Sequence, residues 1–472
     1  MSTIKTSLWL SLIILLSCYR IATGAVLHLD GTQDRIDLQE HLEWFAGDKA
    51  EMDIIDLLAN EGRFEKAPKR NSYSRSPYPY WFHLRLLPHD PLEKQRLLEL
   101  AYTQIDRLEY YSRVGKGPWR QVSTGDKRPF ASRDIRHPHP VFRVPLQPGV
   151  VTEIVLRVQS NTSIMVPLTL WREDAFASYN QDLLLINGIS YGVLLALVFY
   201  NLFLYPTVRD PAYLWFALYL GSFALFQFSL DGLSARYLWP QWPEVADRAV
   251  TLSLWICMAA GLKFTQHIGH TRRYSPKFDR LFGGLSLFAL LMAGVVALRG
   301  PGTVFPLLPP FGLLVVLLIP VPLWIAWRNG YLPARFALLA YLPVVPGALL
   351  IAARTLNRVE PSFWSEHLFI IGAALSSILL SFALADRINI MRTRQAVTQA
   401  KLLESERAAS RAQQKFSRQL LEAQDNERRR IAADLHDSVG QNLSFLHNML
   451  KRFQRQKKVA LPAAINEAAQ NA

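Results

Sequence analysis

Apolar and polar residues alternate along the first third of the chain. The alternation is clearest in 82–86 and 154–158, where an apolar side chain stands at every second position. A period of two is typical of half-buried β-strands. Pro148-Gly149 and Gly115-Lys116-Gly117 are typical turn sequences between such strands. Because helix-period segments are nearly absent here, residues 25–174 are predicted to form an all-β sandwich domain.

The pattern changes abruptly after Asp182, where long apolar runs replace the alternation. Each run has about the 20 residues that a membrane-spanning helix needs. The region 183–386 is therefore predicted to be a seven-helix transmembrane bundle. The seven runs lie near 183–205, 211–230, 247–265, 280–298, 304–327, 334–353 and 367–386.

From Ile388 onward the pattern is helical and charged. A weak alanine-rich seam indicates a coiled-coil signalling helix over 387–423, and a stronger apolar stripe continues through 424–472. The weak seam consists of Leu402, Ala409, Ala412, Phe416, Leu420 and Ala423. The stronger stripe consists of Ile431, Leu435, Val439, Leu443, Leu446, Leu450 and Phe453.

The first 24 residues have the pattern of a secretory signal peptide. Lys5 supplies a positive start, Leu8–Leu16 a short apolar segment, and small residues precede Ala25. The apolar segment is too short to span a bilayer. Whether Cys18 in this leader is lipidated stays open.

Loop charge predicts the orientation of the bundle. The loops and flanks on one side hold most of the arginines and lysines, and the opposite set holds only Arg236, Arg248, Arg299, Arg354 and Arg358. The basic side is expected to be cytoplasmic. An odd number of spans then places the exported β domain outside and the tail inside. The predicted location is a bacterial inner membrane, with a periplasmic N-terminal domain.

Composition agrees with a membrane protein, since 50% of residues are hydrophobic and 19% are charged. Two cysteines exclude a disulfide framework. The net charge is +14, and the tail from Arg387 contributes 16 Lys/Arg against 8 Asp/Glu. A basic tail can bind nucleic acid or acidic lipid. A solvated cytoplasmic helix beside membrane lipid is the simpler interpretation, and no direct nucleic-acid partner is expected.

The segment Glu427–Gln441, ERRRIAADLHDSVGQ, carries the main candidate chemistry. His436 is followed directly by Asp437, and Gln441 comes one helical turn later. A neutral imidazole is a good nucleophile near neutral pH. An adjacent carboxylate can hold its tautomer and accept its other ring proton.

This segment resembles the phosphoacceptor box of two-component sensor histidine kinases of the HDxxxQ subgroup. The resemblance implies that His436 is the phosphoacceptor, that Asp437 is its general base and orienting group, and that Gln441 positions water in a phosphatase reaction. It also implies a homodimer built on a helical hairpin, of which this chain contains an incomplete part, and a response-regulator receiver domain as partner.

Motifs outside this box resemble the bacterial seven-transmembrane receptors with diverse intracellular signalling modules (7TMR-DISM). The resemblance implies a jelly-roll-like outer sandwich that binds a periplasmic ligand, with carbohydrate as a candidate. The matching membrane motifs are Tyr200-Asn201-Leu202-Phe203, Arg209-Asp210-Pro211-Ala212-Tyr213-Leu214, Asp231-Gly232 and Tyr237-Leu238-Trp239-Pro240. The matching outer motifs are Trp81-Phe82-x-Leu84-x-Leu86, Thr124-Gly125-Asp126, Pro129-Phe130, Leu156–Ser160 and Pro167–Trp171.

Other candidate sites are weaker. His137-Pro138-His139 offers two metal ligands, but no carboxylate or cysteine cluster accompanies it in the sequence, so no metal site is assigned. Three aromatic residues on a strand could stack on a sugar, although strand aromatics are more often core: Tyr78, Tyr80 and Trp81. Polar groups in or near membrane helices are often functional or bridge helices: Asn187, Asn201, Gln227 and Lys263.

Nothing after Gln441 resembles the asparagine and glycine boxes that hold Mg-ATP, and no Walker-type loop is present. No cofactor is therefore expected in this chain, and Mg-ATP would act through a missing or separate catalytic domain. The expected function is a membrane sensor histidine kinase whose sequence, as given, is inactive alone. The alternatives are a kinase-inactive receptor that pairs with or is phosphorylated by another kinase chain, and a ligand-binding transporter. Ligand identity, the cognate regulator and the natural end of the chain stay open.

Overall fold

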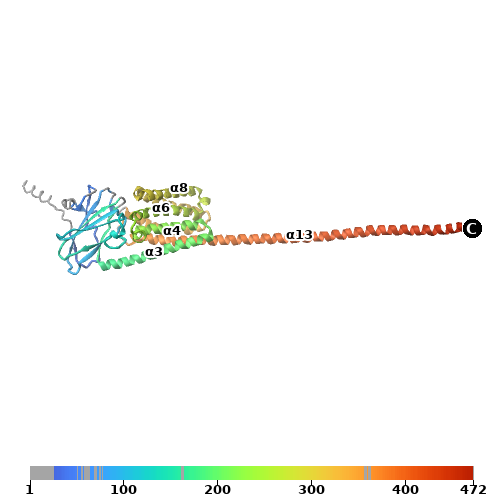
Figure 1. Ribbon diagram of the computed structural model, residues 1–472, viewed down its shortest axis with the longest axis horizontal. Coiled ribbons are helices and arrows are strands. Elements are labelled where there is room, and N and C mark those ends of the chain that lie inside the picture. Colours follow the sequence, from blue (N-terminus) through green and yellow to red (C-terminus); the bar gives the residue numbers. More distant parts are fainter. Residues whose placement is uncertain are drawn as a thin grey trace, which may run out of the picture. The chain divides into compact units, whose positions relative to one another are not determined.

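The computed structural model describes residues 26–49, 52–54, 57, 64–68, 72–73, 76, 78–160, 164–355, 359 and 363–470. The predicted signal peptide and Cys18 lie outside the described residues. The chain divides into two compact units, residues 1–388 and residues 389–472. The first unit contains a β-rich domain and a bundle of apolar helices, and the second continues the last helix (Figure 1).

The β domain consists of two main sheets and one small one. The larger sheet has the order β4-β3-β6-β11-β8-β9, with β1 parallel to β6, and the second has the order β10-β7-β13-β2. The strands of the larger sheet are β1 (Leu27–Leu29), β3 (Glu43–Ala46), β4 (Glu65–Lys66), β6 (Tyr80–Pro88), β8 (Arg107–Val114), β9 (Arg120–Thr124) and β11 (Thr152–Gln159). The second sheet contains β2 (Arg35–Asp37), β7 (Gln95–Leu100), β10 (Val141–Pro145) and β13 (Leu168–Trp171), while β5 (Ser72–Tyr73) pairs with β12 (Ile164–Met165).

One apolar core lies between the two main sheets. Phe82, Leu84 and Leu156 from the larger sheet pack in the same cluster as Leu98 and Leu170 from the second. The predicted β-sandwich is therefore confirmed. The predicted turns are also present, since Gly115 links β8 to β9 with φ 57° and Gly149 has φ 72°.

The prediction of half-buried strands was wrong in the middle of the larger sheet. Its outer face is covered as well, because Trp81, Tyr111 and Val155 pack with Leu57 and Phe64 in a second cluster. The residues that alternate with the core are therefore buried too: Trp81 is 0% exposed and Val155 is 0% exposed. The period of two separates two apolar layers here, instead of separating core from solvent.

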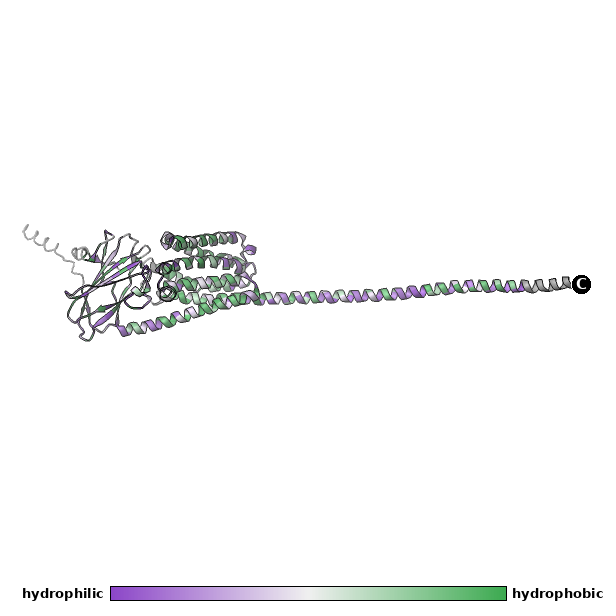
Figure 2. Cartoon of the chain, viewed as in Figure 1, coloured by the Kyte–Doolittle hydropathy of each residue, from purple (hydrophilic) through white to green (hydrophobic). Residues whose placement is uncertain are grey.

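Seven helices of the described chain are long and apolar enough to span a membrane, as predicted. Figure 2 shows the apolar residues concentrated on these helices. The spans are α3 (Glu173–Val208), α4 (Pro211–Leu230), α6 (Pro243–Ile268), α8 (Pro276–Arg299), α9 (Leu308–Leu318) with α10 (Pro320–Arg328), α11 (Pro333–Tyr341) with α12 (Val344–Thr355), and the start of α13 (Phe363–Gln470). The short elements are η2 (Phe130–Ser132), α5 (Leu233–Tyr237), α7 (Thr271–Tyr274), η3 (Pro301–Thr303) and η4 (Phe305–Leu307).

The bundle has its own core and also contacts the β domain. Phe216, Trp255 and Phe282 are fully buried between the helices. The segment between α4 and α6 contacts the β domain, where the Thr103 hydroxyl donates to the Leu230 carbonyl at 2.8 Å. The Phe130 amide donates to the Pro240 carbonyl at 3.0 Å. The chain is thus a multidomain membrane protein, as expected.

Candidate functional site

The second unit is a single helical segment, and its described side chains from Arg392 onward are all exposed to solvent. The His436 side chain is 88% exposed and that of Asp437 is 79% exposed. The stripe leucines beside them are also uncovered, with Leu435 at 58% and Leu443 at 61%. A helix with an uncovered apolar stripe gains most of its stability only when another helix covers that stripe.

His436 and Asp437 lie side by side on the exposed surface of the helix. The His436 Nδ1 lies 3.6 Å from the Asp437 Oδ1, which is longer than a hydrogen bond. In this orientation Asp437 faces Nδ1, and Nε2 is the ring nitrogen directed away from the carboxylate. A proton held on Nδ1 leaves the electron pair of the neutral imidazole on Nε2.

Gln441 is exposed and follows Asp437 by four residues, so the two side chains share a helix face. Gly440 directly precedes Gln441 in the sequence. A Cβ placed on Gly440 would meet nothing within 4 Å in the single chain. Glycine costs a helix interior about 1 kcal/mol relative to alanine, and the single chain gives no packing reason for it.

The polar membrane residues are mostly satisfied within the bundle. The Asn201 side chain is 1% exposed and donates to the Leu197 carbonyl of its own helix at 2.8 Å. Gln227 donates to Asp231 at 2.9 Å, and Tyr191 also donates to Asp231. Asn187 and Lys263 are partly exposed. A signalling role for Asn201 stays a prediction.

The candidate aromatic residues do not form one platform. Tyr80 belongs to the core between the sheets, whereas Trp81 packs in the cluster on the opposite face of β6. Only Tyr78 of the three is exposed, at 42%. The interpretation of strand aromatics as core residues is therefore the correct one for Tyr80 and Trp81.

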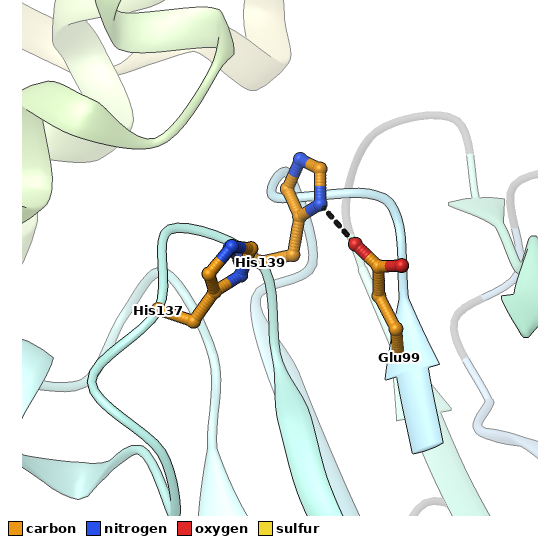
Figure 3. Close-up of side chains that lie close together, drawn as sticks. All are labelled: Glu99, His137 and His139. Atoms are coloured by element: carbon orange, nitrogen blue, oxygen red, sulfur yellow. Dashed lines mark hydrogen bonds and ion pairs between the residues drawn. The ribbon is translucent and has the colours of Figure 1, made fainter. Parts of the chain in front are cut away.

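The fold brings a carboxylate to the two candidate histidines. Glu99 on β7 lies beside His137 and His139, and one ligand atom from each residue falls within 4.8 Å of the others. Figure 3 shows the carboxylate pointing at the His139 ring, with the His137 ring next to it. No sequence pattern pointed to Glu99, because it is 38 residues from His137 and only the sheet brings them together.

A second cluster among the described residues consists of Asp106, Asp126 and Asp247. Lys127 pairs with Asp106 at 3.1 Å. Burial and the charges of Asp106 and Asp247 raise the pKa of Asp126 well above its usual range, although Lys127 and Arg133 oppose the shift. Asp247 belongs to α6, so this cluster joins the β domain to the bundle.

Three family models match separate parts of the chain. Residues 39–172 match the family described as 7TMR-DISM extracellular 2, and residues 183–387 match 7TM diverse intracellular signalling. Residues 427–472 match the histidine kinase family HisKA_3. The chain therefore contains regions similar to the outer and membrane domains of 7TMR-DISM proteins, followed by a region similar to histidine kinases. The resemblance found in the sequence is confirmed.

The histidine kinase match covers His436, Asp437 and Gln441. The matched regions combine domains typical of two-component signalling with a multi-pass membrane region. The comparison with curated proteins finds no match.

Proposed function

We propose that this protein is a membrane sensor of a two-component system and that His436 is its phosphoacceptor. The observation that carries the proposal is the exposed pair of His436 and Asp437, inside the segment that matches the histidine kinase family. A phosphoryl donor and a receiver domain both need open access to the imidazole. The 88% exposure of the His436 side chain provides that access.

The proposed chemistry assigns one step to each residue. Asp437 holds the Nδ1 proton of His436, so Nε2 attacks the γ-phosphorus of ATP and the bond to the leaving ADP breaks. ATP with its Mg²⁺ is bound by a catalytic domain that supplies the nucleotide. The phosphoryl group then passes from Nε2 to a receiver aspartate. Gln441, one turn further, orients the water that later hydrolyses the aspartyl phosphate.

The proposed active form is a homodimer. The stripe of Ile431, Leu435, Val439, Leu443 and Leu446 is between 48% and 61% exposed in the single chain. Covering such a side chain contributes about 1.5–3 kcal/mol, so a second copy of the helix is the natural partner. His436 lies about 100° around the helix from Leu435 and stays accessible when the stripe is covered.

The proposed orientation places the β domain in the periplasm of a bacterial inner membrane and His436 in the cytoplasm. The arginine-poor loops are expected outside, and the segment between α4 and α6, which contacts the β domain, belongs to that set. The odd number of spans then brings the C-terminal helix to the opposite side. A periplasmic ligand would shift the chain between states that already exist.

Phosphotransfer tests the proposal. The chain in lipid nanodiscs would receive radiolabelled Mg-ATP and a catalytic domain from a kinase of the same subgroup. We expect an acid-labile, alkali-stable phosphoryl group on the parent and none on His436→Gln. His447→Gln is the matched control, because His447 lies three turns further on nearly the same face but is followed by Asn448. Labelling that survives in His436→Gln would overturn the assignment.

A further inference from the structure

Glu99 faces away from the core between the sheets. Its neighbours Leu98 and Leu100 point into that core, so the period of two directs Glu99 to the outer face of the second sheet. The start of α3 covers this face, where Phe176 packs against Leu97, Val141 and Trp171. A carboxylate therefore lies buried between a sheet and the helix that continues as the first membrane span.

Two histidines surround the Glu99 carboxylate. The His139 Nδ1 lies 2.7 Å from the Glu99 Oε1, and the Trp171 indole donates to the Oε2 at 2.8 Å. An ionised carboxylate at 3% exposure needs a positive partner. A proton on His139 or a metal ion can supply that charge.

The arrangement matches a metal site in its donors and in the groups around them. Two imidazoles and one carboxylate are a common ligand set for Zn²⁺, which bonds to them at about 2.0–2.2 Å. The His137 Nδ1 accepts from the His139 amide at 3.1 Å, so an ion that takes the electron pair of this nitrogen replaces that hydrogen bond.

The candidate ligands have further polar contacts of the kind that orient metal ligands in proteins. Trp171 holds one oxygen of Glu99, and the Asn180 Oδ1 lies 3.1 Å from the His137 Nε2. Asn180 and Phe176 both belong to α3, and the Phe176 ring lies edge-on to His137 at 5.2 Å. His137 is therefore in direct contact with two residues of α3.

We propose that Glu99, His137 and His139 bind a divalent transition-metal ion such as Zn²⁺ at the junction between the outer domain and the first membrane helix. In this site the ion replaces the proton shared by His139 and Glu99. Binding draws the loop that carries both histidines toward β7 and fixes Asn180 through His137. That the ion also acts as a sensory input rests on the function proposed above.

Metal binding can be measured without any phosphotransfer. The full chain, purified in detergent with a tag that lacks histidine and stripped with a chelator, would be titrated with Zn²⁺ against a chromophoric competitor. We expect one tight equivalent per chain. Glu99→Gln and His139→Asn should lose it, and Asn180→Ala should weaken it by about 10- to 100-fold, as is typical of groups that orient metal ligands. Co²⁺ should give the visible absorption bands of a four-coordinate site.

The exposed pair of His28 and His89 provides a matched control, because their ring nitrogens lie 2.8 Å apart on the surface of the same domain. His89→Gln should keep the tight equivalent. If His89→Gln loses it and Glu99→Gln keeps it, the ion binds an adventitious surface pair and the proposal is overturned. It is equally overturned if no tight equivalent exists while circular dichroism shows native fold in every variant. Zn²⁺ that binds at Glu99 but leaves the phosphorylation of His436 unchanged would overturn only the sensory role.

Discussion

Arg387 and Asp210 form a buried ion pair where the last membrane helix meets the first inter-helix loop. The Arg387 Nη2 lies 2.8 Å from the Asp210 Oδ2, and both side chains are about nine-tenths buried, at 10% and 11% exposure. Asp210 also caps α4, since its Oδ1 accepts from the Ala212 amide at 3.0 Å. Arg387 donates to the His267 carbonyl at 3.0 Å. One arginine therefore ties α13 to both α4 and α6.

Removing the arginine should destabilise the bundle. Arg387→Ala leaves the Asp210 carboxylate buried without its charged partner, and loss of one member of a buried pair costs about 3–5 kcal/mol. Thermal unfolding in detergent, followed by tryptophan fluorescence, should show a clear drop in midpoint. Arg392→Ala is the control, because Arg392 is exposed five residues further along the same helix. Equal midpoints for the two variants would contradict the structural role of the pair.

Asp126 should lower the stability of the first unit at neutral pH. Its raised pKa means that the folded chain retains the proton to a higher pH than the unfolded chain does. The free energy of unfolding therefore falls as the pH rises from the pKa of Asp126 in the unfolded chain, about 3.9, through its pKa in the folded chain. Asp126→Asn removes this cost, so its unfolding midpoint should exceed that of the parent at neutral pH. The two midpoints should converge near about pH 4.

An exposed aspartate provides the control for this pH profile. Asp30→Asn changes the same chemical group at an exposed position of the β domain. Its profile should follow that of the parent throughout. A parent-like profile for Asp126→Asn would show that Asp126 does not titrate in the range where the buried cluster predicts it.

The membrane helices could be predicted from the sequence because a bilayer demands long apolar runs, and length alone separates these from core helices. The phosphoacceptor region could be recognised because its chemistry is local: His436, Asp437 and Gln441 lie within six residues. The sandwich followed from the alternation of strands such as 154–158. In each case the signal lies within one stretch of chain.

Glu99, the cover on the larger sheet and the Arg387–Asp210 pair could not be predicted in this way. Each depends on strands or helices far apart in the sequence, and no local pattern specifies which will be neighbours. Val155, for example, has the spacing of a solvent-facing residue but lies under Leu57 and Phe64. The missing information is the tertiary contact itself, which propensity and periodicity do not encode.

The stripe leucines should hold the dimer together. Leu443→Glu places a charge in the proposed interface of both copies, and each lost leucine contributes about 1.5–3 kcal/mol. The dissociation constant of the dimer should therefore rise by more than about 100-fold. Light scattering of the chain in detergent, after chromatography over a range of concentrations, measures this. Asn448→Glu adds the same charge away from the stripe and should leave the dimer intact; a monomer in both cases would argue against a specific interface.

Gln441 should act only when phosphate is removed. Gln441→Ala leaves the imidazole of His436 and its neighbour Asp437 unchanged, so acceptance of phosphate should stay within about twofold of the parent. Dephosphorylation of the receiver should slow by roughly 10- to 100-fold, because the attacking water loses the amide that positions it. The decay of labelled receiver phosphate, with and without the dimeric chain, separates the two steps. Asn442→Ala, at the next residue on a different helix face, is the control and should retain both rates. If Gln441→Ala instead reduces acceptance and leaves the decay unchanged, the amide serves the phosphoacceptor step and the assignment of Gln441 to water is wrong.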